Sequence, residues 1–99
     1  MIQQVYTDKA PQTIGHYSQA TIVNGFIFCS GQVGVDQQTK MLVEGVEAQT
    51  HQVMKNLLAV LEAAGSDFEH VVKTTIYLVD ISDFPKVNEI YSSYFVDNK

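Results

Sequence analysis

The feature that most restricts the fold is a long amphipathic stretch in the middle of the chain. Between residues 46 and 64, apolar side chains recur three and four residues apart, which is the spacing of one face of an α-helix. The stripe consists of Val46, Val53, Leu57, Val60, Leu61 and Ala64, widened by Met54 and Leu58. Gly65 follows where a helix C-terminus favours glycine. The pattern predicts a helix over residues 46–64 that packs its apolar face on other elements.

A β-hairpin is predicted before this helix. Asn24 and Gly25 join two apolar runs, and both residues tolerate the positive φ that a type I′ turn requires. We expect Thr21–Val23 and Phe26–Ser30 to pair as antiparallel strands. The short run Ile2–Tyr6 predicts one more strand near the N-terminus.

The last third of the chain has the pattern of a strand followed by a second helix. Residues 71–80, VVKTTIYLVD, are largely apolar or hydroxylic on both faces, so a strand covered on both sides is predicted. Ser82 or Asp83 can cap a helix that holds Pro85 in its first turn. A further strand would ordinarily return to the sheet after such a helix. The order strand, hairpin, helix, strand, helix is therefore expected to lack a returning strand within these 99 residues.

Length and charge favour one domain over residues 1–99 and argue against a nucleic-acid partner. A chain of 99 residues with 45% hydrophobic content fits a single small globular domain, a size at which oligomerisation commonly completes the core. The formal charge is −5, and the six basic residues are all lysines scattered singly along the chain. Nucleic-acid binding relies on clustered cations that neutralise phosphates.

Signals for export or membrane insertion are not visible in the sequence. The N-terminal stretch has no basic flank followed by an apolar run, and the continuous apolar runs are only a few residues long. A single cysteine, Cys29, excludes an intrachain disulfide and suits a reducing compartment. We expect a cytoplasmic protein without a membrane partner.

Few residues indicate a chemistry by themselves. His16, His51 and His70 lie in separate predicted elements without ligands at metal-binding spacing, so no metal site is predicted. Cys29 lies inside a predicted strand without a cationic neighbour, which favours a buried, inert thiol. Asn88 shares a helix face with apolar side chains, so its amide needs either a backbone partner or a ligand.

Ser30 and Gly31 end the second hairpin strand in a turn. Glycine there allows a ligand or a second backbone to approach closely, although the pair also fits a simple strand terminator. The nearby GQVG lacks both the spacing and the lysine of a phosphate-binding loop. The residue types alone leave both interpretations open.

Five segments, taken in order, resemble the Rid family of reactive-intermediate, or YjgF-like, deaminases over essentially the whole chain. They are GHYSQA, FCSGQVGVD, VEGVEAQTHQVMKNLLAVLEAAG, VVKTTIYLVDISDF and VNEIY. Each segment is weak alone, but the ordered set is highly specific. The resemblance implies a chorismate-mutase-like α+β fold, a mixed sheet with two helices on one face, assembled as a homotrimer with a ligand cleft at each subunit interface. It also implies hydrolysis of 2-imino acids, formed from 2-aminoacrylate-type enamines, to 2-keto acids and ammonia without a cofactor.

The resemblance also assigns residues to the cleft. Tyr17 and Ser30 match positions expected to be catalytic. Positions expected to bind the substrate are matched by Gly31, Phe84 and Asn88. The opening stretch GHYSQA, which has no feature of a strand, is thereby interpreted as a wall of the cleft.

Two departures from the family pattern bear on activity. His16 stands where the family usually has proline, which either loosens the loop or adds a pH-sensitive group. Family members continue with a Pro-Ala-Arg motif and two strands, which supply an arginine for the substrate carboxylate and a glutamate for the attacking water. The 99 residues end at Lys99 before either, and lysine does not reproduce the bidentate grip of arginine. We expect deaminase activity from the complete protein and little from these 99 residues alone.

Two other functions compete with deamination. A trimer that binds 2-keto acids or other small metabolites without turnover would use the same cleft, and loss of the water-positioning acid would harm only the enzyme. Ribonuclease or translation-inhibitor activity, sometimes attached to this family, conflicts with the acidic charge balance.

Overall fold

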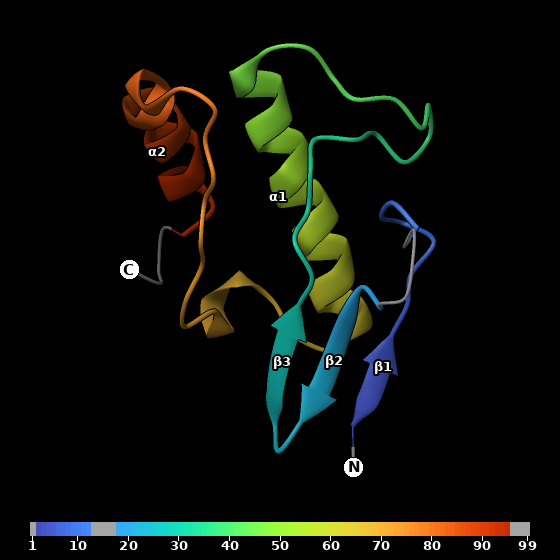
Figure 1. The fold of residues 1–99 in the computed structure, drawn as a ribbon. Coiled ribbons are helices and arrows are strands. Elements are labelled where there is room, and N and C mark those ends of the chain that lie inside the picture. The colour runs from blue at the N-terminus through green and yellow to red at the C-terminus, as the bar shows by residue number, and fades with distance from the viewer. Residues whose placement is uncertain (1, 13–17, 96–99) are drawn as a thin grey trace.

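The computed structural model describes residues 2–12 and 18–95, which form an antiparallel three-stranded sheet with two α-helices beside it (Figure 1). Strand β1 (Gln3–Val5) pairs with β2 (Ala20–Val23), and β2 pairs with β3 (Phe26–Cys29). The φ angles of Asn24 and Gly25 are 51° and 79°. The predicted hairpin and its left-handed turn are therefore confirmed.

Helix α1 (Val46–Ala63) ends as its sequence predicts. Gly65 has a φ of 83°, and its N–H donates to the carbonyl oxygen of Glu62 at 3.0 Å. The N–H of Ser66 donates to the carbonyl oxygen of Leu61 at 2.8 Å. This is the Schellman arrangement, in which glycine accepts the left-handed conformation that lets the chain leave the helix.

The core lies between α1 and one face of the sheet. Val60 of α1 is fully buried and belongs to one cluster with Val5, Ala10 and Ala20. Partly buried residues that pack against this cluster are Ile22, Ile27, Ala59 and Ala64. The apolar stripe predicted for the helix thus faces the hairpin, as its spacing requires.

Helix α2 (Phe84–Ser93) packs beside α1 and is joined to it by polar contacts (Figure 1). Lys86 Nζ lies 2.8 Å from Glu47 Oε1, and His51 Nδ1 lies 2.7 Å from the Tyr94 hydroxyl. Asp83 occupies the N-cap position but makes no capping hydrogen bond with its side chain. Short 3₁₀ turns precede α2 at η1 (Phe68–His70) and η2 (Ile81–Asp83).

The strand predicted over residues 71–80 is wrong for the described part of the chain. No strand forms between η1 and η2 there, and Figure 1 draws the segment as an irregular orange stretch leading to α2. Coverage on both sides also fails, because Val72, Tyr77 and Val79 are 88%, 93% and 110% exposed. A strand is defined by ladder hydrogen bonds to a neighbour. β-Branched composition alone does not supply that neighbour.

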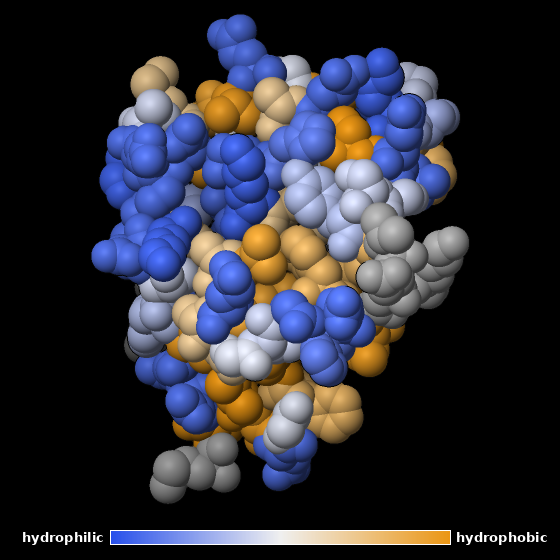
Figure 2. Space-filling model, turned by 180° about the vertical axis from the view of Figure 1, so that it is seen from behind, coloured by the Kyte–Doolittle hydropathy of each residue, from blue (hydrophilic) through white to orange (hydrophobic). Residues whose placement is uncertain are grey.

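Apolar side chains gather on the lower half of the face that Figure 2 shows. Seen from behind, apolar residues predominate over the lower half of the molecule, where the strands lie, and polar residues over much of the upper half (Figure 2). Contiguous exposed apolar area occurs at protein or membrane contacts and at ligand-binding grooves. Neither described helix could cross a bilayer, since none combines the necessary length with sufficient apolar character.

Candidate functional site

The turn after β3 holds two of the predicted site residues. Ser30 is half-buried, and its backbone N–H donates to the carbonyl oxygen of Gln19 at 2.9 Å. The Ser30 hydroxyl donates to the same oxygen at 3.1 Å. The end of β3 is thereby fixed to the start of β2, and the hydroxyl is held in one orientation.

Neither backbone conformation nor packing within the described residues requires a glycine at position 31. It does not have a positive φ, and a Cβ added there would meet nothing within 4 Å. Gly34 is different, because a Cβ there would lie 2.9 Å from both Cα and Cβ of Gln49. Internal packing therefore explains Gly34, whereas Gly31 leaves open space beside the oriented hydroxyl of Ser30, where an outside group can approach.

The other two described site residues lie on α2. Phe84 is 49% exposed and Asn88 is exposed, while the neighbouring Val87 is the residue that α2 buries. The Asn88 amide is exposed in the single chain and has no need of a backbone partner there, so its pairing with a ligand stays a prediction. The face of α2 that turns inward is set by its packing on α1, and Asn88 lies outside that face.

The predicted residues form two separate groups in one chain. Within the described residues, no hydrogen bond or ion pair joins the Ser30–Gly31 turn to Phe84 or Asn88. Tyr17 and His16 lie outside the described residues. Their assignment to the cleft stays a prediction, as do the roles of the other four.

Sequence reasoning missed Gln19, which is the largest fully buried side chain of the described residues. It is 1% exposed, and its amide bonds to the backbone of Thr7 and Pro11. A glutamine next to a serine in GHYSQA gives no hydrophobic signal of burial. The one available sign was its place immediately before a strand.

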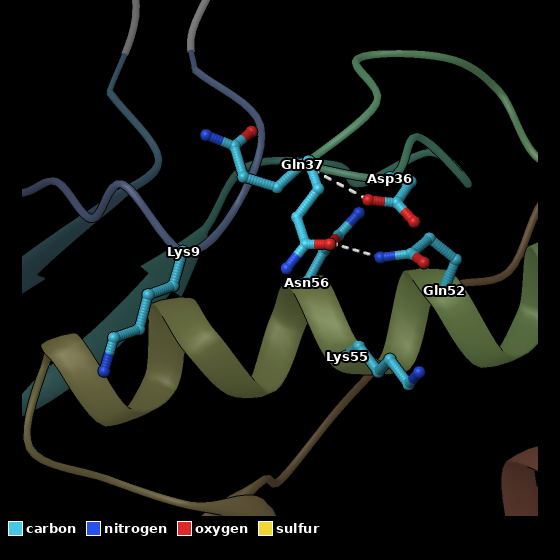
Figure 3. A pocket seen from close by; sticks show the side chains of 7 residues that line it. Lys9, Asp36, Gln37, Gln52, Lys55 and Asn56 are labelled. Carbon is cyan, nitrogen blue, oxygen red and sulfur yellow. Dashed lines mark hydrogen bonds between the residues drawn. The ribbon is translucent and has the colours of Figure 1, made fainter.

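A polar hollow of about 260 Å³ lies beside α1, away from the predicted residues (Figure 3). Its lining residues are Lys9, Asp36, Gln37, Gln38, Gln52, Lys55 and Asn56. Asn56 is 1% exposed and donates to the carbonyl oxygens of Val33 and Val35 at 3.1 and 3.0 Å. In Figure 3 the ammonium groups of Lys9 and Lys55 point away from the central amides. The buried Asn56 amide accordingly holds the 33–35 backbone to α1.

The pKa values of Cys29, His70 and Asp67 are shifted by their local surroundings. Cys29 is exposed, so the expectation of a buried thiol is wrong, although desolvation raises the pKa of its thiol and thereby disfavours the reactive thiolate. The hydrogen bond from His70 Nδ1 to Asp67, 2.8 Å long, raises the pKa of His70 and lowers that of Asp67. Among the described residues, no group of three or more His, Cys, Asp and Glu side chains could hold a metal ion.

Comparison with known sequences gives a consistent set of relatives. The family model described as endoribonuclease L-PSP matches residues 7–99. A RutC family protein of Aquifex aeolicus is 50% identical over 96 residues, which are 97% of this chain and 77% of that protein. The 2-iminobutanoate/2-iminopropanoate deaminase of Rattus norvegicus is 52% identical over 95 residues, which are 95% of this chain and 69% of that protein.

Solved structures agree with the sequence relatives. A conserved Rid-family protein of Yersinia pestis superposes with a TM-score of 0.97 at 42% identity, covering 100% of this chain and 79% of that one. TdcF of E. coli, solved with bound serine, gives a TM-score of 0.91 at 31% identity, covering 97% of this chain and 76% of that one. The α+β arrangement of the described residues is thus that of these proteins.

Proposed function

This chain belongs to the Rid family, the endoribonuclease L-PSP or YjgF-like proteins, and from that premise we propose that the complete protein is a hydrolytic imine deaminase. The proposed substrates are 2-imino acids that arise from 2-aminoacrylate-type enamines. Water adds to the imine carbon, the carbinolamine loses ammonia, and a 2-keto acid remains. Relatives at about half identity that are named 2-iminobutanoate/2-iminopropanoate deaminases support this proposal.

The observation that carries the proposal within this chain is the Ser30–Gly31 turn. An oriented hydroxyl lies beside a glycine that neither backbone conformation nor internal packing requires. Hydrolysis of an imine needs a positioned water and fixed polar groups more than an activated nucleophile. A turn that holds a hydroxyl still and leaves space for substrate suits that need, and the proposed reaction uses no cofactor.

We propose that Tyr17, Phe84 and Asn88 complete the cleft in a cytoplasmic homotrimer. Phe84 and Asn88 are exposed in the single chain and lie on a different element from Ser30. Exposure of an aromatic ring and an amide on one helix supports a role for that helix at a subunit boundary, where both would contact a ligand or a partner. Light scattering that shows a stable monomer of the complete protein would contradict this assembly.

The proposed function is tested by ammonia release in an assay coupled to a threonine dehydratase, which supplies the enamine. Asn88→Ala in the complete protein should lower kcat/KM by about 10-fold or more with little loss of stability, since an exposed amide contributes little to the fold. Ser92→Ala, a change at another exposed position of α2, is the matched control and should be neutral. A complete, folded protein that releases no ammonia above the uncatalysed rate would refute the proposal.

Non-catalytic ligand binding is the second candidate, because the structural relative TdcF was solved with bound serine. In this case the same cleft would bind serine or a 2-keto acid without turnover. Calorimetry with serine and 2-ketobutyrate, run beside the ammonia assay, separates the two functions. Binding with no turnover favours the regulatory alternative.

We propose that nuclease activity is absent, despite the description of the family as endoribonuclease. A chain of formal charge −5 with isolated lysines offers no cluster of cations for phosphates. RNA cleavage that persists through several columns and is lost in Lys73→Ala would contradict this.

A further inference from the structure

Gln19 joins two segments through one buried amide. Its Oε1 accepts the N–H of Thr7 at 2.5 Å, and its Nε2 donates to the carbonyl oxygens of Thr7 at 3.0 Å and Pro11 at 2.8 Å. The carbonyl oxygen of Ala10 lies 3.4 Å from the same nitrogen. The side chain is 1% exposed, so these bonds have no competition from water. The amide therefore holds residues 7–11 against the start of β2.

The backbone of the same residue determines what the Ser30 hydroxyl can do. The carbonyl oxygen of Gln19 accepts both the N–H and the Oγ–H of Ser30, at 2.9 and 3.1 Å. A serine hydroxyl has one proton to donate and two lone pairs that accept. While the proton is bound by Gln19, Ser30 faces a substrate as a hydrogen-bond acceptor.

We propose that Gln19 is a positioning residue for the deaminase reaction, one that fixes the Ser30 hydroxyl as an acceptor at the mouth of the cleft. The inference rests on the proposed function. The two groups that an imine hydrolysis presents to such an acceptor are the N–H of the imine or iminium and the O–H of the attacking water, and both are donors. Ser30 then orients one of these donors and does not act as nucleophile or acid. Gln19 touches no substrate and acts through Ser30.

The test is a double-mutant cycle on the complete protein with Gln19→Glu and Ser30→Ala. Glutamate keeps the shape of glutamine but replaces the two N–H donors by an oxygen that faces the carbonyls of Thr7 and Pro11. We expect Gln19→Glu and Ser30→Ala each to lower kcat by about 10-fold or more, with a smaller effect on KM, and the double variant to be no slower than Ser30→Ala alone. Non-additivity is expected because Gln19→Glu would act by displacing the Gln19 backbone, whose carbonyl oxygen orients the same hydroxyl that Ser30→Ala removes.

Gln49→Glu is the matched control. The Gln49 side chain also donates to a loop carbonyl, that of Val43 at 3.1 Å, but has no bond to Ser30. The Gln49→Glu variant should leave kcat unchanged. Combined with Ser30→Ala, it should lower kcat only as much as Ser30→Ala does alone. Hydrogen exchange gives a readout independent of turnover, since Gln19→Glu should reduce protection of the Ser30 and Thr7 amides and Gln49→Glu should not.

The outcomes separate this inference from the function on which it rests. A wild-type protein that is inactive toward imines refutes the proposed function and this role with it. An active wild type in which the Gln19→Glu and Ser30→Ala effects multiply shows that Gln19 only stabilises the fold. If Gln19→Glu does not fold, Gln19→Met, which keeps the side-chain length without a charge, replaces it in the same cycle. Losses of kcat from Gln19→Met and Ser30→Ala that multiply would again overturn the inference.

Discussion

The region formed by the sheet and α1 differs sharply from the region formed by residues 66–95. In the first, strands pair with strands, and Val60 of α1 is buried in a cluster with Val5 and Ala20. In the second, apolar side chains between η1 and η2 are exposed, while Val87 and Phe95 are buried and Lys86 pairs with Glu47 of α1. Exposed ion pairs contribute little to stability. The first region is closed by its own packing, whereas the second leaves the side chains between η1 and η2 uncovered.

Extending the chain is the most severe test of this comparison. A family-like continuation that begins Pro-Ala-Arg should increase hydrogen-exchange protection in residues 72–79 and raise ammonia release by at least about 100-fold, because two charge-assisted hydrogen bonds contribute about 1.5 to 3 kcal/mol each. The same continuation with its arginine replaced by lysine is the control, and it should protect the segment without restoring full turnover. Full activity from a well-folded 99-residue chain would show that the carboxylate anchor is assigned to the wrong place.

Local signals were enough to predict the first region. The Asn24-Gly25 turn needs only the two residues that adopt positive φ, and the end of α1 needs only the glycine at position 65. The segment 71–80 could not be predicted in this way, because β-branched composition favours a strand only where a neighbour completes the ladder. The exposure of Asn88 could not be predicted for a similar reason, since the inward face of α2 is set by its packing. Gln19 was missed because the burial of a polar side chain depends on distant carbonyls.

The same substitution in the two regions compares them directly. Val60→Ala, in the cluster on α1, should lower the free energy of unfolding by about 2 kcal/mol or more, since it removes two buried carbons and leaves a cavity. Val79→Ala, in the exposed segment, should change it by no more than about 0.5 kcal/mol in the 99-residue chain. Urea denaturation measures both. Equal losses at the two positions would mean that residues 72–79 are covered in solution and would remove the distinction.

Gly34 and Gly31, in the connection that follows β3, are expected to differ in role: Gly34 is required by packing and Gly31 by function. Gly34→Ala should cost about 1 to 3 kcal/mol, because its new Cβ would lie 2.9 Å from the backbone of Gln49. Gly31→Ala should leave stability unchanged or raise it by up to about 1 kcal/mol, yet lower kcat/KM of the complete protein by about 10-fold or more. Thermal melts and the ammonia assay measure the two effects. A fully active Gly31→Ala variant would place the substrate elsewhere.

The smallest expected effect concerns the His70–Asp67 pair at the boundary between the two regions. The hydrogen bond that His70 Nδ1 donates to Asp67 raises the pKa of His70 above 6.5 and lowers the pKa of Asp67 below 3.8. The stabilisation from a raised histidine pKa is lost as pH rises through that pKa, and the stabilisation from a lowered aspartate pKa is lost as pH falls through that one. The pair therefore contributes fully only between the unfolded-state values of 3.8 and 6.5.

Titration of His70 by NMR should show this shift, and Asp67→Asn should remove most of it. Glu69→Gln is the matched control, because Glu69 raises the pKa of His70 only through a weaker charge interaction. This substitution should therefore lower the pKa of His70 less than Asp67→Asn does. Both side chains of the pair are largely exposed, so the melting temperature should hardly depend on pH through this pair. A large loss of stability in Asp67→Asn, confined to that pH window, would show that the boundary at η1 holds the C-terminal region in place. The comparison between a closely packed region and one with an uncovered segment would then have to be redrawn.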